Sequence, residues 1–104
     1  QRWRAAGGSG AAIPRMLAEA ALLRGLPRKT LDYLGRDNSA DAWRLRAAAH
    51  IAQGEAPAAL DAFRQGLSVG DDYMLARDYA RFMMTTQDDA GTRDALARVQ
   101  RLGP

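Results

Sequence analysis

The chain of 104 residues contains no cysteine, one histidine, one lysine, and only two isoleucines and two valines. The absence of cysteine excludes disulfides, thiolate zinc sites and cysteine nucleophiles. The shortage of β-branched residues disfavours a sheet. The sequence has no apolar run of membrane length, no glycine-rich phosphate loop, no nucleophile elbow and no EF-hand spacing. We therefore expect a protein without catalytic activity, cofactor or bound metal.

The residues that are abundant are those that favour helices. The sequence contains 22 alanines and 12 leucines, and it is 47% hydrophobic and 26% charged. This composition is typical of a soluble, all-α domain. The net charge of +3 is mildly basic and does not form the dense stripe that nucleic-acid binding usually requires.

Apolar spacing, prolines and glycines predict six helices joined by short turns. The segment 1–12, with three glycines and a serine near its centre, is typical of a flexible lead-in. In the first helix, the helical spacing of Leu17, Ala18, Ala21 and Leu22 predicts one buried stripe. Ser39 is a good N-cap for the third helix. The predicted helices cover residues 15–24, 27–34, 40–53, 57 to between 66 and 70, 72–86 and 90–102.

The helix pairs repeat along the chain. A shift of 29 residues places Gly54 on Gly25 and Ala47 on Ala18, and a shift of 33 places Ala47 on Ala80. The same two shifts bring Arg15, Arg44 and Arg77 into one register and superpose three aspartates, namely Asp32, Asp61 and Asp94. Agreement of small, large and charged residues across three units predicts a repeat array.

The central unit resembles a tetratricopeptide repeat (TPR). Its matching residues are a tryptophan, two small residues and two residues at aromatic places, namely Trp43, Ala47, Ala59, His50 and Phe63. The resemblance implies a right-handed α-solenoid of three antiparallel helix pairs, with units at 13–39, 40–72 and 73–104. Pro104 stands where the third unit should carry the terminal proline of the family.

Three residues depart from the family pattern. Arg46 occupies a place that is usually apolar, Gly66 replaces a usual alanine, and Asp71 replaces the terminal proline of the second unit. The register also places His50 in the packing between helices, or in a local hydrogen bond. The acidic pairs 71–72 and 88–89 are predicted to cap helices.

The small and large positions of the repeat predict the core. Small residues let the helices approach closely, and larger ones fill the gaps between them. Trp43 and Tyr79 are expected to pack between neighbouring units. The small residues are Ala18, Ala47, Ala59 and Ala80, and the larger ones are Leu34, Phe63 and Leu96.

In TPR arrays, the first helix of each pair lines a groove that holds a peptide. When the groove positions of the family are assigned to residues of this sequence, they combine arginines with apolar side chains. This combination predicts a partner protein or peptide with acidic and apolar residues. Neighbouring positions Asp41, Ala52 and Thr85 belong to the same lining. The predicted groove residues are Arg15, Glu19, Leu22, Leu23, Arg44, Ala48, Ile51, Met74, Arg77, Arg81 and Met84.

Other interpretations of the groove stay open. The arginines could simply solubilise an alanine-rich surface, or the basic groove could bind RNA, for which only Trp3, Tyr33 and Tyr73 remain as stacking residues. The carboxylate clamp of some TPR proteins is absent, because Glu19 and Leu45 occupy its asparagine places.

The setting of the protein is predicted only in outline. The composition is similar in style to bacterial TPR proteins of envelope and secretion assembly, which implies the bacterial cytoplasm or periplasm. The start at Gln1 suggests a truncated N-terminus. A stripe of Leu96, Val99 and Leu102 on the last helix suggests that the C-terminal pair continues the array or forms a homodimer.

Overall fold

A computed structural model describes residues 12–103, and this part of the chain is all-α. The prediction of six helices without strands is confirmed for these residues. The observed ends differ from the predicted ones by no more than three residues. Apart from Ala12, the predicted lead-in lies outside the described residues. The helices are α2 (Ala12–Leu23), α3 (Pro27–Leu34), α4 (Ala40–Ala52), α5 (Ala56–Val69), α6 (Tyr73–Met83) and α7 (Asp89–Leu102).

The turns after α2 and α4 are built in the same way, 29 residues apart. Gly25 and Gly54 both have φ of +76°, a left-handed conformation that favours glycine. In each turn, the next residue donates its backbone N–H to a carbonyl five positions earlier, from Leu26 to Ala21 and from Glu55 to His50, both at 2.8 Å. The repeat found in the sequence is therefore also a repeat of backbone geometry.

Polar side chains cap three helices as expected. The Ser39 hydroxyl accepts a hydrogen bond from the Ala42 N–H at 3.1 Å. The carboxylates of Asp72 and Asp88 accept from the N–H groups of Leu75 and Gly91, each at 2.9 Å. These caps satisfy backbone donors that a helix cannot pair within itself.

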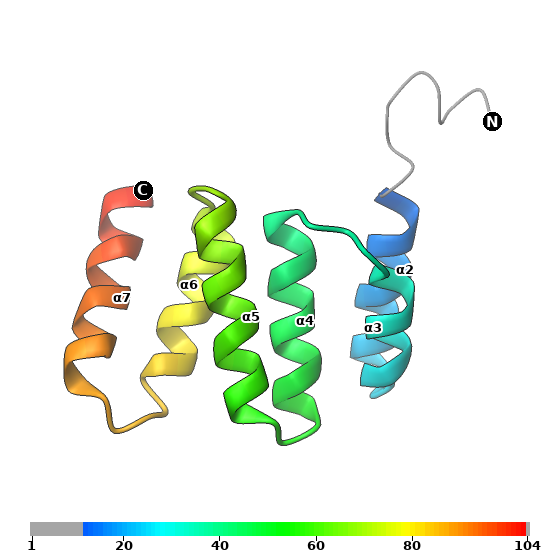
Figure 1. The fold of residues 1–104 in the computed structure, drawn as a ribbon, viewed down its shortest axis with the longest axis horizontal. Coiled ribbons are helices and arrows are strands. Elements are labelled where there is room, and N and C mark those ends of the chain that lie inside the picture. The colour runs from blue at the N-terminus through cyan, green and yellow to red at the C-terminus, as the bar shows by residue number, and fades with distance from the viewer. Residues whose placement is uncertain (1–11, 104) are drawn as a thin grey trace.

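The helices form three antiparallel pairs, each contacting only its neighbour (Figure 1). The first helices α2, α4 and α6 run in the same direction, and the second helices α3, α5 and α7 run back. Helix α4 contacts α2 and α3 on one side and α5 and α6 on the other. Among the described residues, the first and third pairs make no contact, and the molecule measures 48 × 29 × 20 Å. Burial between pairs therefore occurs only where the central pair contacts the first pair and the third pair.

The core is made of alanines that let helices approach and a few large side chains. Phe63 of α5 is 1% exposed, and its ring lies 5.6 Å from that of Tyr79 and 5.5 Å from that of Phe82. This aromatic cluster joins the second pair to the third. Trp43 and Tyr79 both pack between pairs, as predicted. The buried alanines include Ala18, Ala47, Ala59 and Ala80.

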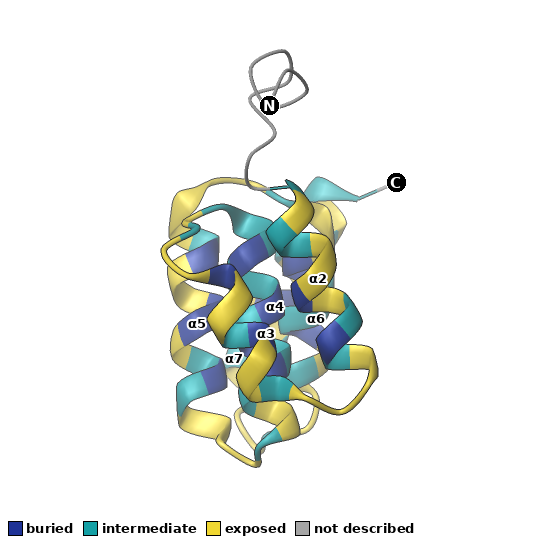
Figure 2. Cartoon of the chain, turned by 90° about the vertical axis from the view of Figure 1, so that its right-hand side faces the viewer, coloured by how far each residue is buried: buried dark blue, intermediate teal, exposed yellow. Residues whose placement is uncertain are grey.

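Two predicted core residues are placed differently. Leu17 belongs to the apolar stripe of the first helix, which helical spacing predicts to be buried, but its side chain is exposed. Within residues 12–103, no helix lies beyond the first pair at this end of the molecule (Figure 2). Leu96 of α7, in the last pair, is exposed as well.

The structure explains two of the three unusual residues of the second unit, Arg46 and Gly66. The Arg46 guanidinium lies 4.4 Å from the centre of the Trp43 ring and donates to the Gly35 carbonyl at 2.9 Å, so its stem fills the apolar place. Burial lowers the pKa of Arg46, and the nearby Asp37 opposes this effect. A Cβ on Gly66 would lie only 2.8 Å from the Cβ of Trp43, so α5 requires glycine at its crossing.

Candidate functional site

One stripe of exposed and partly exposed residues runs along each first helix, and the three stripes together are here called the first-helix face. Its side chains recur three or four residues apart, which places them on one stripe of each helix. Contacts between the stripes of α4 and α6 show that these lie side by side. The face comprises the predicted groove residues (Arg15, Glu19, Leu22, Leu23, Arg44, Ala48, Ile51, Met74, Arg77, Arg81 and Met84), their neighbours Asp41, Ala52 and Thr85, and Asp78.

Arg44 lies at the centre of the face and is surrounded by carboxylates. Its guanidinium is 2.7 Å from Asp41 of the same helix and 3.7 Å from Asp78 of α6. Partial burial would lower the pKa of Arg44, but Asp41, Asp78 and the more distant Glu19 of α2 outweigh it and raise this pKa. One arginine therefore links all three first helices electrostatically.

Two other arginines of the face also have partners within the chain. Arg15 donates through Nε to the Asp37 carboxylate at 2.8 Å, and Arg77 contacts Asp78 at 3.1 Å. Burial would raise the pKa of Asp37, but hydrogen bonds from Ser39 and the charge of Arg15 lower it below its usual value. Arg81 is exposed and has no carboxylate within 4.0 Å among the described residues.

The ends of the first helices carry an apolar band. Leu23, Ile51 and Met84 are 82%, 46% and 62% exposed, and each lies at or directly after the end of a first helix. Because α2, α4 and α6 run in parallel, these three ends lie along the same edge of the molecule (Figure 1). The first-helix face is thus a row of internal ion pairs bordered by exposed apolar side chains.

The geometry assigns different roles to the predicted groove residues. The structure brings all eleven onto the first helices or their C-caps, but it engages Arg15, Arg44 and Arg77 in internal ion pairs. Sequence reasoning missed two partners, Asp37 and Asp78. Asp78 could have been found, since it completes the exposed stripe four residues after Met74. Asp37 lies in a turn, and its approach to Arg15 depends on the fold.

His50 lies next to a carboxylate at the end of α4. Its Nδ1 is 2.8 Å from Glu55 Oε1, across the turn at Gly54. The pair joins the end of the helix to the turn, and neither cavity described for the molecule includes His50. Within residues 12–103, no three metal-ligating side chains gather in one place.

None of the helices in the described part of the chain combines the length and the apolar character needed to cross a bilayer.

Comparison of the chain with protein-family models, with curated proteins and with solved structures found no match in any of the three. The similarity to TPR proteins therefore depends on the residues and helix arrangement described above and stays a prediction.

Proposed function

We propose that this chain is a non-catalytic protein-interaction module, in which three TPR-like helix pairs stack as a right-handed solenoid. The nearest-neighbour packing of the pairs, the shared turn geometry at Gly25 and Gly54, and the small residues at the helix crossings support this architecture. The first-helix face is the surface that binds a peptide or partner protein.

The observation that carries this proposal is the apolar band. Three large apolar side chains, Leu23, Ile51 and Met84, are exposed on three successive first helices and lie along one edge. Exposed apolar groups that gather on one face are typical of binding surfaces, and flexible Leu and Met side chains adapt to varied partners.

The ion pairs restrict the chemistry of the partner. Because Arg44 and Arg77 already contact carboxylates, an acidic partner would have to compete with Asp41 and Asp78. Arg81 is the arginine of the face without such a contact among the described residues, and it can bind one acidic side chain. We propose a partner segment that offers apolar residues to the band and a carboxylate to Arg81.

A peptide library displayed on phage tests this proposal without knowledge of the natural partner. Peptides selected on the protein should carry at least two large apolar residues and one acidic residue. The Ile51→Asp/Met84→Asp variant should bind them at least about tenfold more weakly, since it places charges in the apolar band.

The matched control is Val69→Asp, which changes an apolar residue of similar exposure at the end of α5, off the first-helix face. It should leave affinity unchanged. Selected peptides that bind the Ile51→Asp/Met84→Asp variant as tightly as the wild type would contradict the proposal, provided that circular dichroism shows both proteins folded.

A further inference from the structure

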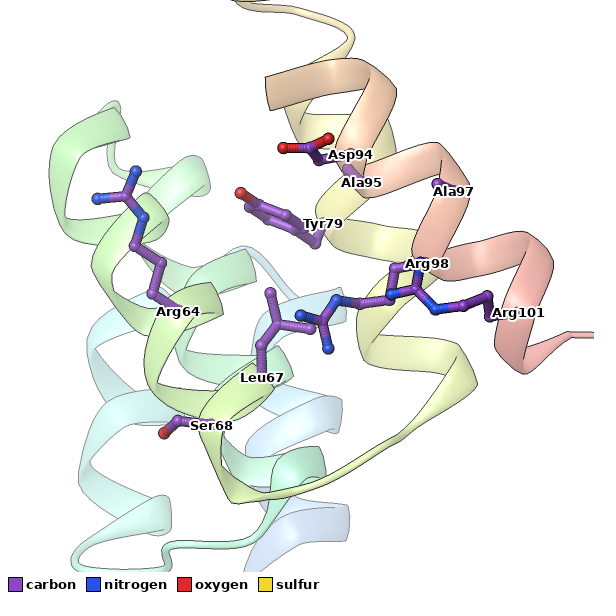
Figure 3. Close-up of a pocket in the computed structure, with 9 residues that line it drawn as sticks. All are labelled: Arg64, Leu67, Ser68, Tyr79, Asp94, Ala95, Ala97, Arg98 and Arg101. Carbon is purple, nitrogen blue, oxygen red and sulfur yellow. The ribbon is translucent and has the colours of Figure 1, made fainter. Parts of the chain in front are cut away.

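A cleft of about 550 Å³ opens between α5 and α7, with α6 at its floor (Figure 3). Its lining combines three arginines, one tyrosine and one serine with small apolar residues. Apart from Tyr79 of α6, its lining comes from the second helices, and it shares no residue with the first-helix face. The lining residues are Arg64, Leu67, Ser68, Tyr79, Asp94, Ala95, Ala97, Arg98 and Arg101.

The cleft stays open because of what its walls are made of. The ring of Tyr79 on α6 lies 5.6 Å from that of Phe63 on α5, and its hydroxyl points toward α5. The α7 wall includes two alanines, Ala95 and Ala97, which are too short to reach α5. Among the described residues, α5 and α7 make no close backbone contact.

The charges in the cleft are arranged unevenly. Arg98 and Arg101 both extend from α7 in the direction of α5, and the Arg98 guanidinium comes near Leu67, while Asp94 lies farther along the cleft, toward Tyr79. Asp94 and Arg101 are two helical turns apart, a separation of about 10 Å. Since α5 and α7 run in the same direction, Arg64 lies on the α5 wall near the level of Asp94. One end of the cleft is therefore close to neutral, and the other holds two positive charges.

The arginines of this cleft differ from those of the first-helix face in their partners. No carboxylate lies within 4.0 Å of Arg64, Arg98 or Arg101 in the part of the chain that the structure describes. On the first-helix face, by contrast, Arg15, Arg44 and Arg77 do have such contacts. Two guanidinium groups without an internal counter-charge, on the same stripe of α7, suit carboxylates, which accept two parallel hydrogen bonds from each guanidinium.

We propose that this cleft is a second binding site, and that it takes a short acidic peptide segment with neighbouring Asp or Glu side chains. The carboxylates bind Arg98 and Arg101, and the peptide backbone follows the cleft over Leu67 and Ala97. Its volume falls in the range of ordinary ligand sites. RNA fits the cleft less well. Tyr79 is the one aromatic residue that lines the cleft, and because its ring is already packed against Phe63, it offers no free surface for a base to stack on.

Fluorescence anisotropy with a labelled hexaglutamate peptide at 0.1 M salt tests the proposal. The wild type should show saturable binding, and Arg98→Glu/Arg101→Glu should weaken it at least about tenfold. The control Arg28→Glu/Arg93→Glu makes the same change in net charge at two exposed arginines outside the cleft, and it should weaken binding by less than about threefold. If the first variant fails to fold, Arg98→Gln/Arg101→Gln replaces it.

A variant that binds hexaglutamate more tightly provides a second test, because a folding defect would weaken binding and could not strengthen it. Asp94→Asn removes the one carboxylate that lines the cleft, so it should tighten hexaglutamate binding about two- to threefold. The proposal is overturned if hexaglutamate does not bind, if the two charge-matched variants lose affinity equally, or if a decauridylate RNA binds the wild type more tightly than hexaglutamate. Competition by inorganic phosphate at concentrations near those of the peptide would also overturn it, because the site would then take a free anion.

Discussion

Replacing Gly66 with alanine should destabilise the protein, although alanine is the better helix former. Inside a helix, the change from glycine to alanine is favourable by about 1 kcal/mol. At this position, however, the new Cβ would lie 2.6 Å from Cδ2 of Leu75 and 2.8 Å from Cβ of Trp43. Leu75 is fully buried, and the Cβ of Trp43 is fixed to its backbone, so neither atom can move away freely.

The expected net effect follows from these two opposing contributions. Overpacking of a core costs about 1–3 kcal/mol, which exceeds the gain in helix propensity. Urea unfolding should therefore show Gly66→Ala to be less stable than the wild type by about 1 kcal/mol. Gly70→Ala is the control, because nothing lies within 4 Å of its Cβ and its backbone is extended, and it should change stability by less than about 0.5 kcal/mol.

A double-mutant cycle identifies the cause of the destabilisation. In a Leu75→Ala background, the Gly66→Ala substitution should cost at least about 0.5 kcal/mol less, since the closest atom has been removed. A Gly66→Ala protein that is more stable than the wild type would refute the reasoning, because it would show that α4, α5 and α6 leave room for a methyl group at this crossing.

Three further substitutions test the packing, the caps and the ion pairs. Phe63→Ala should lower the free energy of unfolding by about 3–5 kcal/mol, because it removes the ring that contacts Tyr79 and Phe82; a loss below about 1 kcal/mol in urea unfolding would contradict the aromatic core. Ser39→Ala should cost about 1 kcal/mol in the same assay, while an unchanged midpoint would mean that the cap of α4 contributes nothing. The folded-state pKa of Asp37 is lowered, so its contribution to stability is present above the unfolded pKa and lost as the pH falls through the folded one. Asp37→Asn should therefore be about 1 kcal/mol less stable than the wild type at pH 7, and the difference should shrink below about pH 4; a difference that stays constant down to about pH 2 would exclude this origin.

The features that were predicted correctly depend on residues close together in the chain. The left-handed glycines Gly25 and Gly54 end helices through hydrogen bonds that span five residues, and the caps at Ser39, Asp72 and Asp88 span three. Such local geometry follows from residue type and spacing, because few distant atoms take part.

The features that were missed depend on contacts between residues that are distant in the sequence. The partner of Arg15 is 22 residues away in a turn, so its carboxylate could not be identified from periodicity. Asp78 completes the stripe of α6, but its contact with Arg44 depends on how α4 and α6 pack. The exposure of Leu17 depends on the absence of a helix beyond α2 in the described structure. The groove residues lie on the expected stripes, but Arg15, Arg44 and Arg77 have carboxylate partners within the chain, and the contact of Arg44 with Asp78 joins two helix pairs.

The cleft between α5 and α7 also could not be predicted from the sequence. Arg98 and Arg101 are separated by three residues on α7, which places them on one face, but the sequence does not show what lies opposite. The binding site proposed for them depends on the gap between α5 and α7, which Tyr79 and the alanines of α7 line.

The central claim is that the first-helix face binds a partner protein, and NMR mapping of a bound peptide tests it most directly. A ¹⁵N-labelled protein would be titrated with a peptide selected on the wild type, and the shifts of the backbone amides would be followed. The account predicts that the largest shifts occur in α2, α4 and α6, centred on Leu23, Ile51 and Met84. Shifts confined to α3, α5 and α7, with the first helices unaffected, would contradict it.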